Sequence, residues 1–483
     1  MRSGAKGLPG RQGRLGRGTY LGYGIGSVGT GIFTTVPGLL LLTFMVRQLA
    51  VPPALAGLVI LMPRLWDMVS DPLAGSLSDR TRTRIGPRRP WLLAGALTLP
   101  VAFALLFRVP ELSGTDAALY VLVVYLLGAT AFTVFQVPYV ALPAEMTEDY
   151  DERTTILAYR IACLTVGILI AGAAAPQVLE AGGGGREGYA LMGLVIGAVL
   201  FVVLIGAFVG TRRIPVVEPT RSTAPFREQL RAAAENRAFF WLLGTFVVQA
   251  LGVGAMLAGV DFFSAYILED TSQTAILFAC LVAPALVTMP LWAWVGHRLG
   301  KKAGYIICIV LFGLGGFALL AAAPDRLVYT YVVVFLMGSA YAGTQMFPLA
   351  MLPDTIAAHT HRTGLRRAGS YTGVWTAGEK VGFALGPAVL AAVLALTGFV
   401  ETEGGAIVDQ PPAALLGIMV GFAIIPAAVV LASLLLLRRY DLDEATVRGF
   451  AGDLTSPPVS PPLAAGDPAS NPLIPPPDPT DRP

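Results

Sequence analysis

Twelve long apolar segments follow one another along the chain, separated by polar stretches that hold most of the charged residues. A helix needs about 20 consecutive apolar residues to cross a bilayer. The segments are unbroken blocks rich in Gly, Ala, Leu and Val, whereas a membrane β-barrel needs alternating stretches of about ten residues. The pattern predicts an all-α membrane protein with spans at 20–46, 54–77, 91–108, 117–141, 156–178, 189–210, 237–267, 274–296, 303–322, 328–350, 369–398 and 412–437.

Composition agrees with this prediction. The 483 residues are 55% hydrophobic and 13% charged, with a mean hydropathy of +0.67, whereas about 25% of the residues of a soluble domain are charged. An ordinary soluble enzyme is therefore excluded. The three cysteines lie far apart inside predicted spans, without the spacing of a disulfide framework or a metal site: Cys163, Cys280 and Cys308.

Basic residues are distributed unevenly between the two sides of the predicted membrane. Of the 34 Lys and Arg residues, only Arg47, Arg108, Arg186 and Arg326 fall on one side, and Arg64, Arg160 and Lys380 fall inside spans. Because Lys and Arg accumulate in cytoplasmic loops, both termini are expected in the cytoplasm of a cell that carries this protein in its inner or plasma membrane. The same rule explains the basic clusters without nucleic-acid binding.

The longest polar stretch between spans divides the twelve helices into two groups of six. We expect a cytoplasmic N-terminal segment at 1–19, six-helix bundles at 20–210 and 237–438, a cytoplasmic linker at 211–236, and a disordered Pro-rich tail at 439–483. An internal repeat relates FQVPYVALPAE in the first half to TQMFPLAMLPDT in the second half. Repeated six-helix halves with a site between them are typical of rocking transporters, and predict the major facilitator superfamily fold.

The loop after the second span carries the pattern Gly75, Asp79, Arg80. This spacing is typical of the major facilitator signature, in which the glycine allows helices to approach and the acid holds cationic groups in one gate state. Loop solubility and topology alone would also place charges here. We expect these three residues to act in gating.

Three ionisable residues stand inside the second span, in RLWDMVSDPLAG: Arg64, Asp67 and Asp71. An intramembrane charge is costly and marks a functional site by default. The two carboxylates are four residues apart and share one helix face, so they can hold a hard cation or a shared proton. Pro72 is expected to free backbone carbonyls nearby. An Arg64–Asp67 pair that merely neutralises itself would still leave Asp71 unexplained.

A further pair stands in WTAGEKVGFALG of the eleventh span. Lys380 cannot lie unpaired in lipid, and the carboxylates of the second span are its expected partners, so Lys380 and Arg64 are candidates for coupling. Glu379 points in another direction, towards a neighbouring helix or the cytoplasmic vestibule. Asp261, near the external end of the seventh span, suits a water-exposed gate or a structural hydrogen bond equally.

These segments resemble the glycoside-pentoside-hexuronide:cation symporters, which include bacterial melibiose carriers and a mammalian sodium-dependent lysolipid transporter. The resemblance covers residues 18–438 and is carried by RLWDMVSDPLAG, DRTRTRIGPRRPW, the VPY of FQVPYVAL, DERTTILAYR, GYGIGSVG and the lysine of the eleventh span. It implies a cation site at Asp67, Ser70, Asp71 and Thr133, and a substrate-pocket arginine at Arg160.

The chain departs from the melibiose carriers where those proteins grip sugar hydroxyls with aspartates. Here the corresponding positions hold Gly31 and Gln136, and losing both carboxylates removes strong discrimination for galactosides. A sugar or glycoside could still be held by stacking and hydrogen bonds from Gln136, Tyr139, Arg160, Trp375 and Thr376. A lysolipid would require a wider apolar cavity and one cation.

The sequence therefore predicts a monomeric transporter in the membrane lipid that couples transport of a small sugar- or glycoside-like solute to Na⁺ or H⁺ by alternating access, without a cofactor. Transport of a lysolipid or another amphiphile, export of hydrophobic compounds and a sensor without transport are the alternatives on the same fold. A membrane-embedded enzyme is disfavoured, because the three histidines form no catalytic constellation near the cytoplasmic ends of their spans: His297, His359 and His361.

Overall fold

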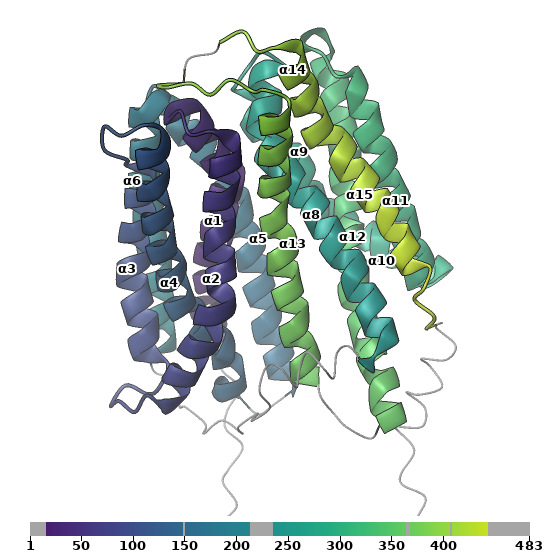
Figure 1. Cartoon of the computed structure of the whole chain (residues 1–483). Coiled ribbons are helices and arrows are strands. Elements are labelled where there is room, and N and C mark those ends of the chain that lie inside the picture. Colours follow the sequence, from purple (N-terminus) through teal and green to yellow (C-terminus); the bar gives the residue numbers. More distant parts are fainter. Residues whose placement is uncertain (1–15, 148–149, 213–234, 364–367, 406–407, 443–483) are drawn as a thin grey trace, which may run out of the picture.

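The structure is a computed structural model that describes residues 16–147, 150–212, 235–363, 368–405 and 408–442 (Figure 1). Long helices dominate the described residues. They are α1 (Arg17–Val36), α2 (Pro53–Arg80), α3 (Arg89–Phe107), α4 (Gly114–Met146), α5 (Tyr150–Ala181), α6 (Gly185–Thr211), α8 (Arg237–Tyr266), α9 (Gln273–Val282), α10 (Pro284–Leu299), α11 (Lys301–Ala318), α12 (Leu327–Thr363), α13 (Ala368–Leu396), α14 (Pro412–Met419) and α15 (Ile425–Leu437). Short helical turns are η1 (Pro37–Leu41), η2 (Phe44–Gln48), η3 (Leu319–Ala321), η4 (Pro324–Arg326) and η5 (Val420–Ile424).

Within the described ranges, twelve helical segments are long and apolar enough to cross a membrane, as the hydropathy pattern predicts. The first joins α1 to η1, the eighth joins α9 to α10, and the twelfth joins α14, η5 and α15. Large apolar side chains such as Leu194 and Val202 are exposed on the outside of the helix bundle, where lipid replaces water as the solvent. The chain is therefore a multi-pass membrane protein.

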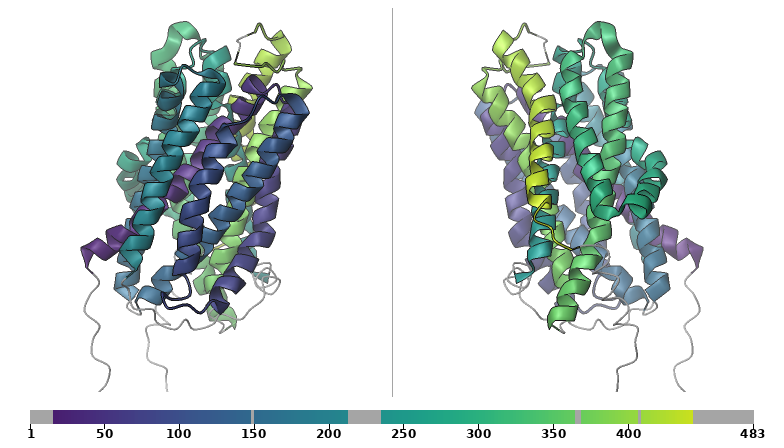
Figure 2. Two further views of the ribbon diagram at one scale, coloured as in Figure 1. Left: turned by 90° about the vertical axis from the view of Figure 1, so that its left-hand side faces the viewer. Right: turned by 90° about the vertical axis from the view of Figure 1, so that its right-hand side faces the viewer.

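The helices form two groups, which we call the N-terminal half (α1–α6) and the C-terminal half (α8–α15). In the N-terminal half, α1 packs against α5 and α6, and α3 packs against α4 and α6. In the C-terminal half, α8 packs against α13 and α15, and α11 packs against α12 and α15. The halves meet along α2 with α13 and along α5 with α9. Figures 1 and 2 show this side-by-side arrangement.

Glycines allow the closest helix contacts inside each half. A Cβ added at Gly167 of α5 would lie 2.3 Å from the Val28 carbonyl oxygen of α1, and one at Gly386 of α13 would lie 2.3 Å from the Ala255 nitrogen of α8. Small residues are the usual means of helix association in lipid, where apolar burial drives little. These contacts make each half a tightly packed unit.

The beginning of α1 and the end of α15 lie at the same end of the bundle, which we call the termini end (Figure 2). The opposite end, which carries the turns 181–185 and 267–272 and the loop 397–405, is the far end. Residues 1–15 of the predicted terminal segment, residues 213–234 of the predicted linker and residues 443–483 of the predicted tail lie outside the described residues.

Several helices extend beyond the predicted spans. α12 continues to Thr363, so His359 and His361 lie on a helix that runs past residue 350, where the predicted span ends. His359 is buried against the ring of Tyr371. Pro72 stands inside an α2 that continues to Arg80, so the proline does not end the helix.

Candidate functional site

The charged residues of α2 meet the lysine of α13 midway between the two ends of the bundle. The Lys380 Nζ lies 2.5 Å from the Asp71 Oδ2, and this ion pair joins the two halves. The other oxygen of the same carboxylate, Oδ1, accepts a hydrogen bond of 2.8 Å from the Thr133 hydroxyl of α4. The structure thus places the lysine beside the carboxylates of the second span, as the sequence predicts.

One helical turn earlier on α2, the Arg64 Nη1 lies 3.6 Å from the Asp67 Oδ2. The intrahelical pair considered from the sequence is therefore present. It satisfies only half of the carboxylate, because Asp67 Oδ1 is buried and has no hydrogen-bond partner among the described residues. A buried acceptor without a donor is costly, and a ligand that supplies positive charge would remove this cost.

Several carboxylate and hydroxyl oxygens of α2 and α4 lie close together beside these acids. The Ser70 hydroxyl lies 3.3 Å from the Thr133 hydroxyl, which in turn bonds Asp71. We use the term α2–α4 oxygen cluster for the side-chain oxygens of Asp67, Ser70, Asp71 and Thr133. Carboxylate and hydroxyl oxygens are the ligands that hard cations such as Na⁺ prefer. Since the Lys380 ammonium already neutralises one member, a cation entering the cluster would compete with it.

Two predicted substrate residues of α4 are turned towards α1 within the same half. The Gln136 Oε1 accepts a hydrogen bond of 2.8 Å from the Thr30 hydroxyl. Tyr139 is fully buried, and its hydroxyl donates a bond of 2.6 Å to the Tyr23 carbonyl. In this structure both side chains therefore join α1 to α4, and their roles in substrate binding stay predictions.

Arg160 of α5 is half-buried and makes no hydrogen bond or ion pair with any described residue. It leaves an unpaired guanidinium in the N-terminal half. On α13, Thr376 is exposed and donates only to the carbonyl of Thr372. Trp375 is buried and stacks on Phe246 at 4.7 Å between ring centroids. Arg160 and Thr376 are thus available to a ligand in this state, whereas Trp375 is a packing residue in it.

Gly31 explains one departure from the melibiose carriers in physical terms. A Cβ at this position would lie 2.6 Å from the carbonyl oxygen of Leu164 in α5. The position is therefore a helix contact without room for a carboxylate in this structure.

The predicted gating residues lie at the termini end of α2. The Asp79 Oδ1 lies 2.5 Å from the Arg88 Nη2, while Arg80 is exposed. The Arg88 guanidinium also donates to the Ser78 hydroxyl. A Cβ at Gly75 would meet Val137 at 3.6 Å, an ordinary contact, so close approach does not require glycine there in this state. Asp79 thus ties the end of α2 to the start of α3.

At the far end a second ion pair joins the halves. The Arg47 Nη1 of η2 lies 3.4 Å from the Asp261 Oδ2 of α8, and both side chains are buried. The Thr274 hydroxyl donates 2.9 Å to the other carboxylate oxygen, and the guanidinium lies 5.4 Å from the ring centre of Tyr266. Asp261 thus makes structural hydrogen bonds here.

Backbone contacts close the far end around this pair. The loop after α13 reaches across to the N-terminal half at the top of Figure 1, where Glu403 pairs with Leu49 in an antiparallel bridge. The Gly405 nitrogen and the Thr402 hydroxyl both donate 2.9 Å to the carbonyl of Arg47. Arg186 of α6 adds a half-exposed ion pair of 3.2 Å to Glu403. We call these contacts together the far-end seal.

Arg47 is the residue of this seal that sequence reasoning missed. The sequence places it just beyond the first span, and the structure keeps it at that end of the bundle but buries its guanidinium, because the chain continues through η1 and η2. The signal was the apolar segment MVRQLAV, in which Arg47 is the only charge.

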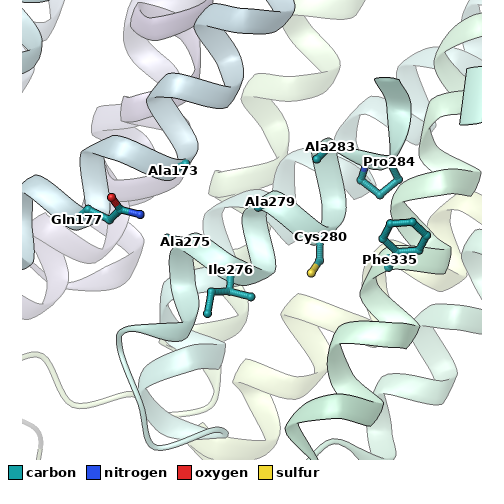
Figure 3. A pocket seen from close by; sticks show the side chains of 9 residues that line it. All are labelled: Ala173, Gln177, Ala275, Ile276, Ala279, Cys280, Ala283, Pro284 and Phe335. Atoms are coloured by element: carbon teal, nitrogen blue, oxygen red, sulfur yellow. The ribbon is translucent and has the colours of Figure 1, made fainter. Parts of the chain in front are cut away.

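Two grooves lie away from the α2–α4 oxygen cluster. One of about 390 Å³ runs beside the seam between α5 and the α9–α10 helix, lined by alanines with Gln177, Ile276, Cys280 and Phe335 (Figure 3). The other, of about 1000 Å³, lies between α3 and α6, between Arg108 and Phe201. Both are mainly apolar and suit hydrocarbon rather than a sugar.

Relatives with known names are symporters. The chain is 28% identical to the uncharacterized symporter YnaJ of Bacillus subtilis over 90% of this chain and 94% of that protein. It is 26% identical to the putative glycoside/cation symporter YagG of Escherichia coli, with the same coverage of both proteins. It is also 26% identical to the sodium-dependent lysophosphatidylcholine symporter 1 of Mus musculus, over 71% of each chain.

Among solved structures, a bacterial homologue of the human drug peptide transporters PepT1 and PepT2 superposes with a TM-score of 0.63 at 14% identity, over 91% of this chain and 99% of that chain. At this identity the likeness shows the fold alone, and that fold is the predicted one of the major facilitator superfamily. The family description MFS/sugar transport protein matches residues 22–444. With two six-helix halves and the motifs of the cation symporters, the chain belongs to this transporter family.

Proposed function

We propose that this symporter imports a sugar or glycoside-like solute with Na⁺ or H⁺, by alternating access, across a cell membrane with both termini in the cytoplasm. The observation that carries the proposal is the α2–α4 oxygen cluster, where Lys380 from the other half lies 2.5 Å from Asp71. A cation that takes the place of this ammonium changes the attraction between the halves. Ligand coupling requires such a differential contact.

Solute recognition in this proposal relies first on polar groups that make no hydrogen bond to another helix. Arg160 offers a cation and Thr376 an exposed hydroxyl, one from each half. Gln136 and Tyr139 require a rearrangement of α1 against α4 before they contact a solute, because both are hydrogen-bonded to α1 here. The chain acts as a monomeric transporter without a catalytic role or cofactor.

A lysolipid or another amphiphile is the second candidate substrate. The groove beside α5 and α9 is apolar, is lined by membrane-spanning helices and carries one amide, from Gln177 (Figure 3). An acyl chain fits such a surface better than a sugar does. The named relatives include both glycoside and lysophosphatidylcholine symporters.

Uptake by purified protein in sealed vesicles tests the proposal. Radiolabelled glycosides and a lysophospholipid are offered with an inward Na⁺ gradient, an inward H⁺ gradient, or neither. We expect one solute class to accumulate only with one gradient, and Asp71→Asn to abolish this accumulation. Glu187→Gln, a change in the first turn of α6, is the matched control. Uptake that never depends on either gradient would overturn cation coupling.

A further inference from the structure

Most of the acidic residues in the predicted spans form ion pairs with basic residues, and one does not. Four acids lie inside the predicted spans, and three of them form ion pairs: Asp67 with Arg64, Asp71 with Lys380, and Asp261 with Arg47. Glu379 of α13 makes no hydrogen bond or ion pair with any described residue. It is half-buried inside a predicted and observed span, so its charge lacks both bulk water and a partner.

Glu379 faces away from the α2–α4 oxygen cluster. Neighbouring residues of a helix point about 100° apart, so Glu379 does not share the face by which Lys380 reaches α2. It shares a face with Thr376 and Thr372, which stand three and seven positions earlier. Thr376 is exposed, so no other helix covers this face of α13 at that position.

The groups around Glu379 come from three elements. On α12, Tyr341 is close enough to interact with it electrostatically. On its own helix, the nearest cation is Lys380, whose ammonium is held by Asp71 of α2. On α8, the residues that pack against the adjacent Gly378 are Leu243 and Val247, which are apolar. None of these groups is a free cation.

A carboxylate without an ion-pair partner in such surroundings favours its neutral form, because burial penalises the charge and the adjacent ammonium of Lys380 is held by Asp71. We infer that Glu379 is a proton-binding site in the C-terminal half, separate from the α2–α4 oxygen cluster. The ligand is H⁺.

The protonation state of Glu379 would change cation binding at the α2–α4 oxygen cluster, because both involve Lys380. When Glu379 loses its proton, its charge attracts the adjacent ammonium of Lys380 and competes with Asp71 for it. The Asp71 carboxylate is then freed for a cation, so deprotonation of Glu379 favours cation binding. Proton and cation thus oppose each other, and the coupling must be equal in both directions. This consequence depends on the proposed function, whereas protonation of Glu379 does not.

Infrared difference spectroscopy on the purified chain tests protonation without a substrate. We expect the carbonyl stretch of a protonated carboxylic acid to lose one component in Glu379→Gln and to keep it in the control Glu187→Gln. Glu379→Asp, which keeps the acid, should retain a shifted component. An unchanged protonated-acid signal in Glu379→Gln at neutral pH would overturn the proton site.

Equilibrium binding of ²²Na⁺ measured across a range of pH tests whether proton binding at Glu379 weakens cation binding. In the wild type, affinity should fall as pH falls. Glu379→Gln mimics the protonated state, so we expect wild-type affinity at neutral pH, where Glu379 is protonated, and a shallower pH dependence, with affinity about tenfold below the wild type at alkaline pH, equivalent to one pKa unit. If Glu379→Gln bound Na⁺ with the wild-type affinity and the wild-type pH dependence throughout, the proposed coupling between proton and cation would be wrong. Absence of Na⁺ and H⁺ coupling in every form would overturn the proposed function while leaving the infrared result intact.

Discussion

Two of the ion pairs that join the halves of this transporter differ in how deeply they are buried and in what surrounds them. The far-end pair of Arg47 and Asp261 is buried, with side-chain exposures of 7% and 10%, and Thr274 bonds the remaining carboxylate oxygen. The central pair of Lys380 and Asp71 has 29% exposure on each side chain. The neighbouring Asp67 keeps a buried oxygen without a partner.

The difference indicates different tasks. Removing one member of a buried ion pair costs about 3–5 kcal/mol, because the other charge is left without a partner. A buried pair whose carboxylate is bonded at both oxygens, backed by a backbone bridge, therefore holds the far end closed, although the Arg47 Nε has no partner among the described residues. The central site is incomplete and partly exposed, so a ligand can complete it or replace the lysine. We regard the far-end seal as the element that fixes the present state and the α2–α4 oxygen cluster as the element that responds to ligands.

The largest effect is expected at the centre, from Asp71→Asn. The change removes the anionic partner of Lys380 and the acceptor of the Thr133 hydroxyl. Concentrative uptake should fall to the level of empty vesicles, and Asp67→Asn should act in the same way. Folding is checked by thermal unfolding in detergent. Concentrative uptake by the double variant at the wild-type level would show that the cluster does not bind the coupling cation.

Lys380→Ala should uncouple transport rather than weaken solute binding. Asp71 would keep its bond to Thr133 but lose its counter-charge, so it would hold a cation or a proton in every state. We expect cation binding to persist while accumulation is lost. Lys301→Ala is the matched control, since that lysine pairs at 2.7 Å with Asp354 within one half. Unchanged cation dependence and pH dependence of uptake in Lys380→Ala would contradict the prediction.

Much of the fold and part of this comparison follow from sequence. The twelve spans are predictable because bilayer thickness imposes one length on every apolar helix. The contact of Lys380 with the acids of α2 is predictable because an ammonium in a span needs an anion. The acids of α2 and Lys380 can thus be identified from sequence, because a charged side chain inside a membrane span is energetically unfavourable.

The far-end seal is not predictable in this way. Arg47 looks like an ordinary interfacial arginine, and only the continuation of the helix through η2 buries it. Its pairing with Asp261 is a contact between residues 214 positions apart. The inward turn of Tyr139 towards α1 escapes sequence reasoning for the same reason, since an aromatic residue beside a polar motif suits a pocket and a helix contact equally.

Breaking the far-end pair should shift the state of the transporter. We expect Arg47→Gln to favour opening of the far end by roughly 3 kcal/mol, about a hundredfold in the ratio of states. Spin labels on the exposed loop positions Ser113 and Asp325 would report a longer distance. Exchange of the charges, Arg47→Asp with Asp261→Arg, should restore much of the closed population. Identical distance distributions in wild type and Arg47→Gln would show that the pair does not hold the seal.

The smallest effect is expected at the edge of the seal, from Glu403→Gln. The Glu403 carboxylate is 61% exposed and its partner Arg186 is half-exposed, so water and salt screen their ion pair. The change should alter the closed population by at most about 0.5 kcal/mol, and less as salt is raised. Arg186→Gln should have a larger effect, because its guanidinium also donates to the carbonyls of Gln48 and Leu112. The same pair of spin labels measures both variants. If Glu403→Gln opened the far end as much as Arg47→Gln does, the exposed edge would be as important to closure as the buried pair, and the distinction between them would be wrong.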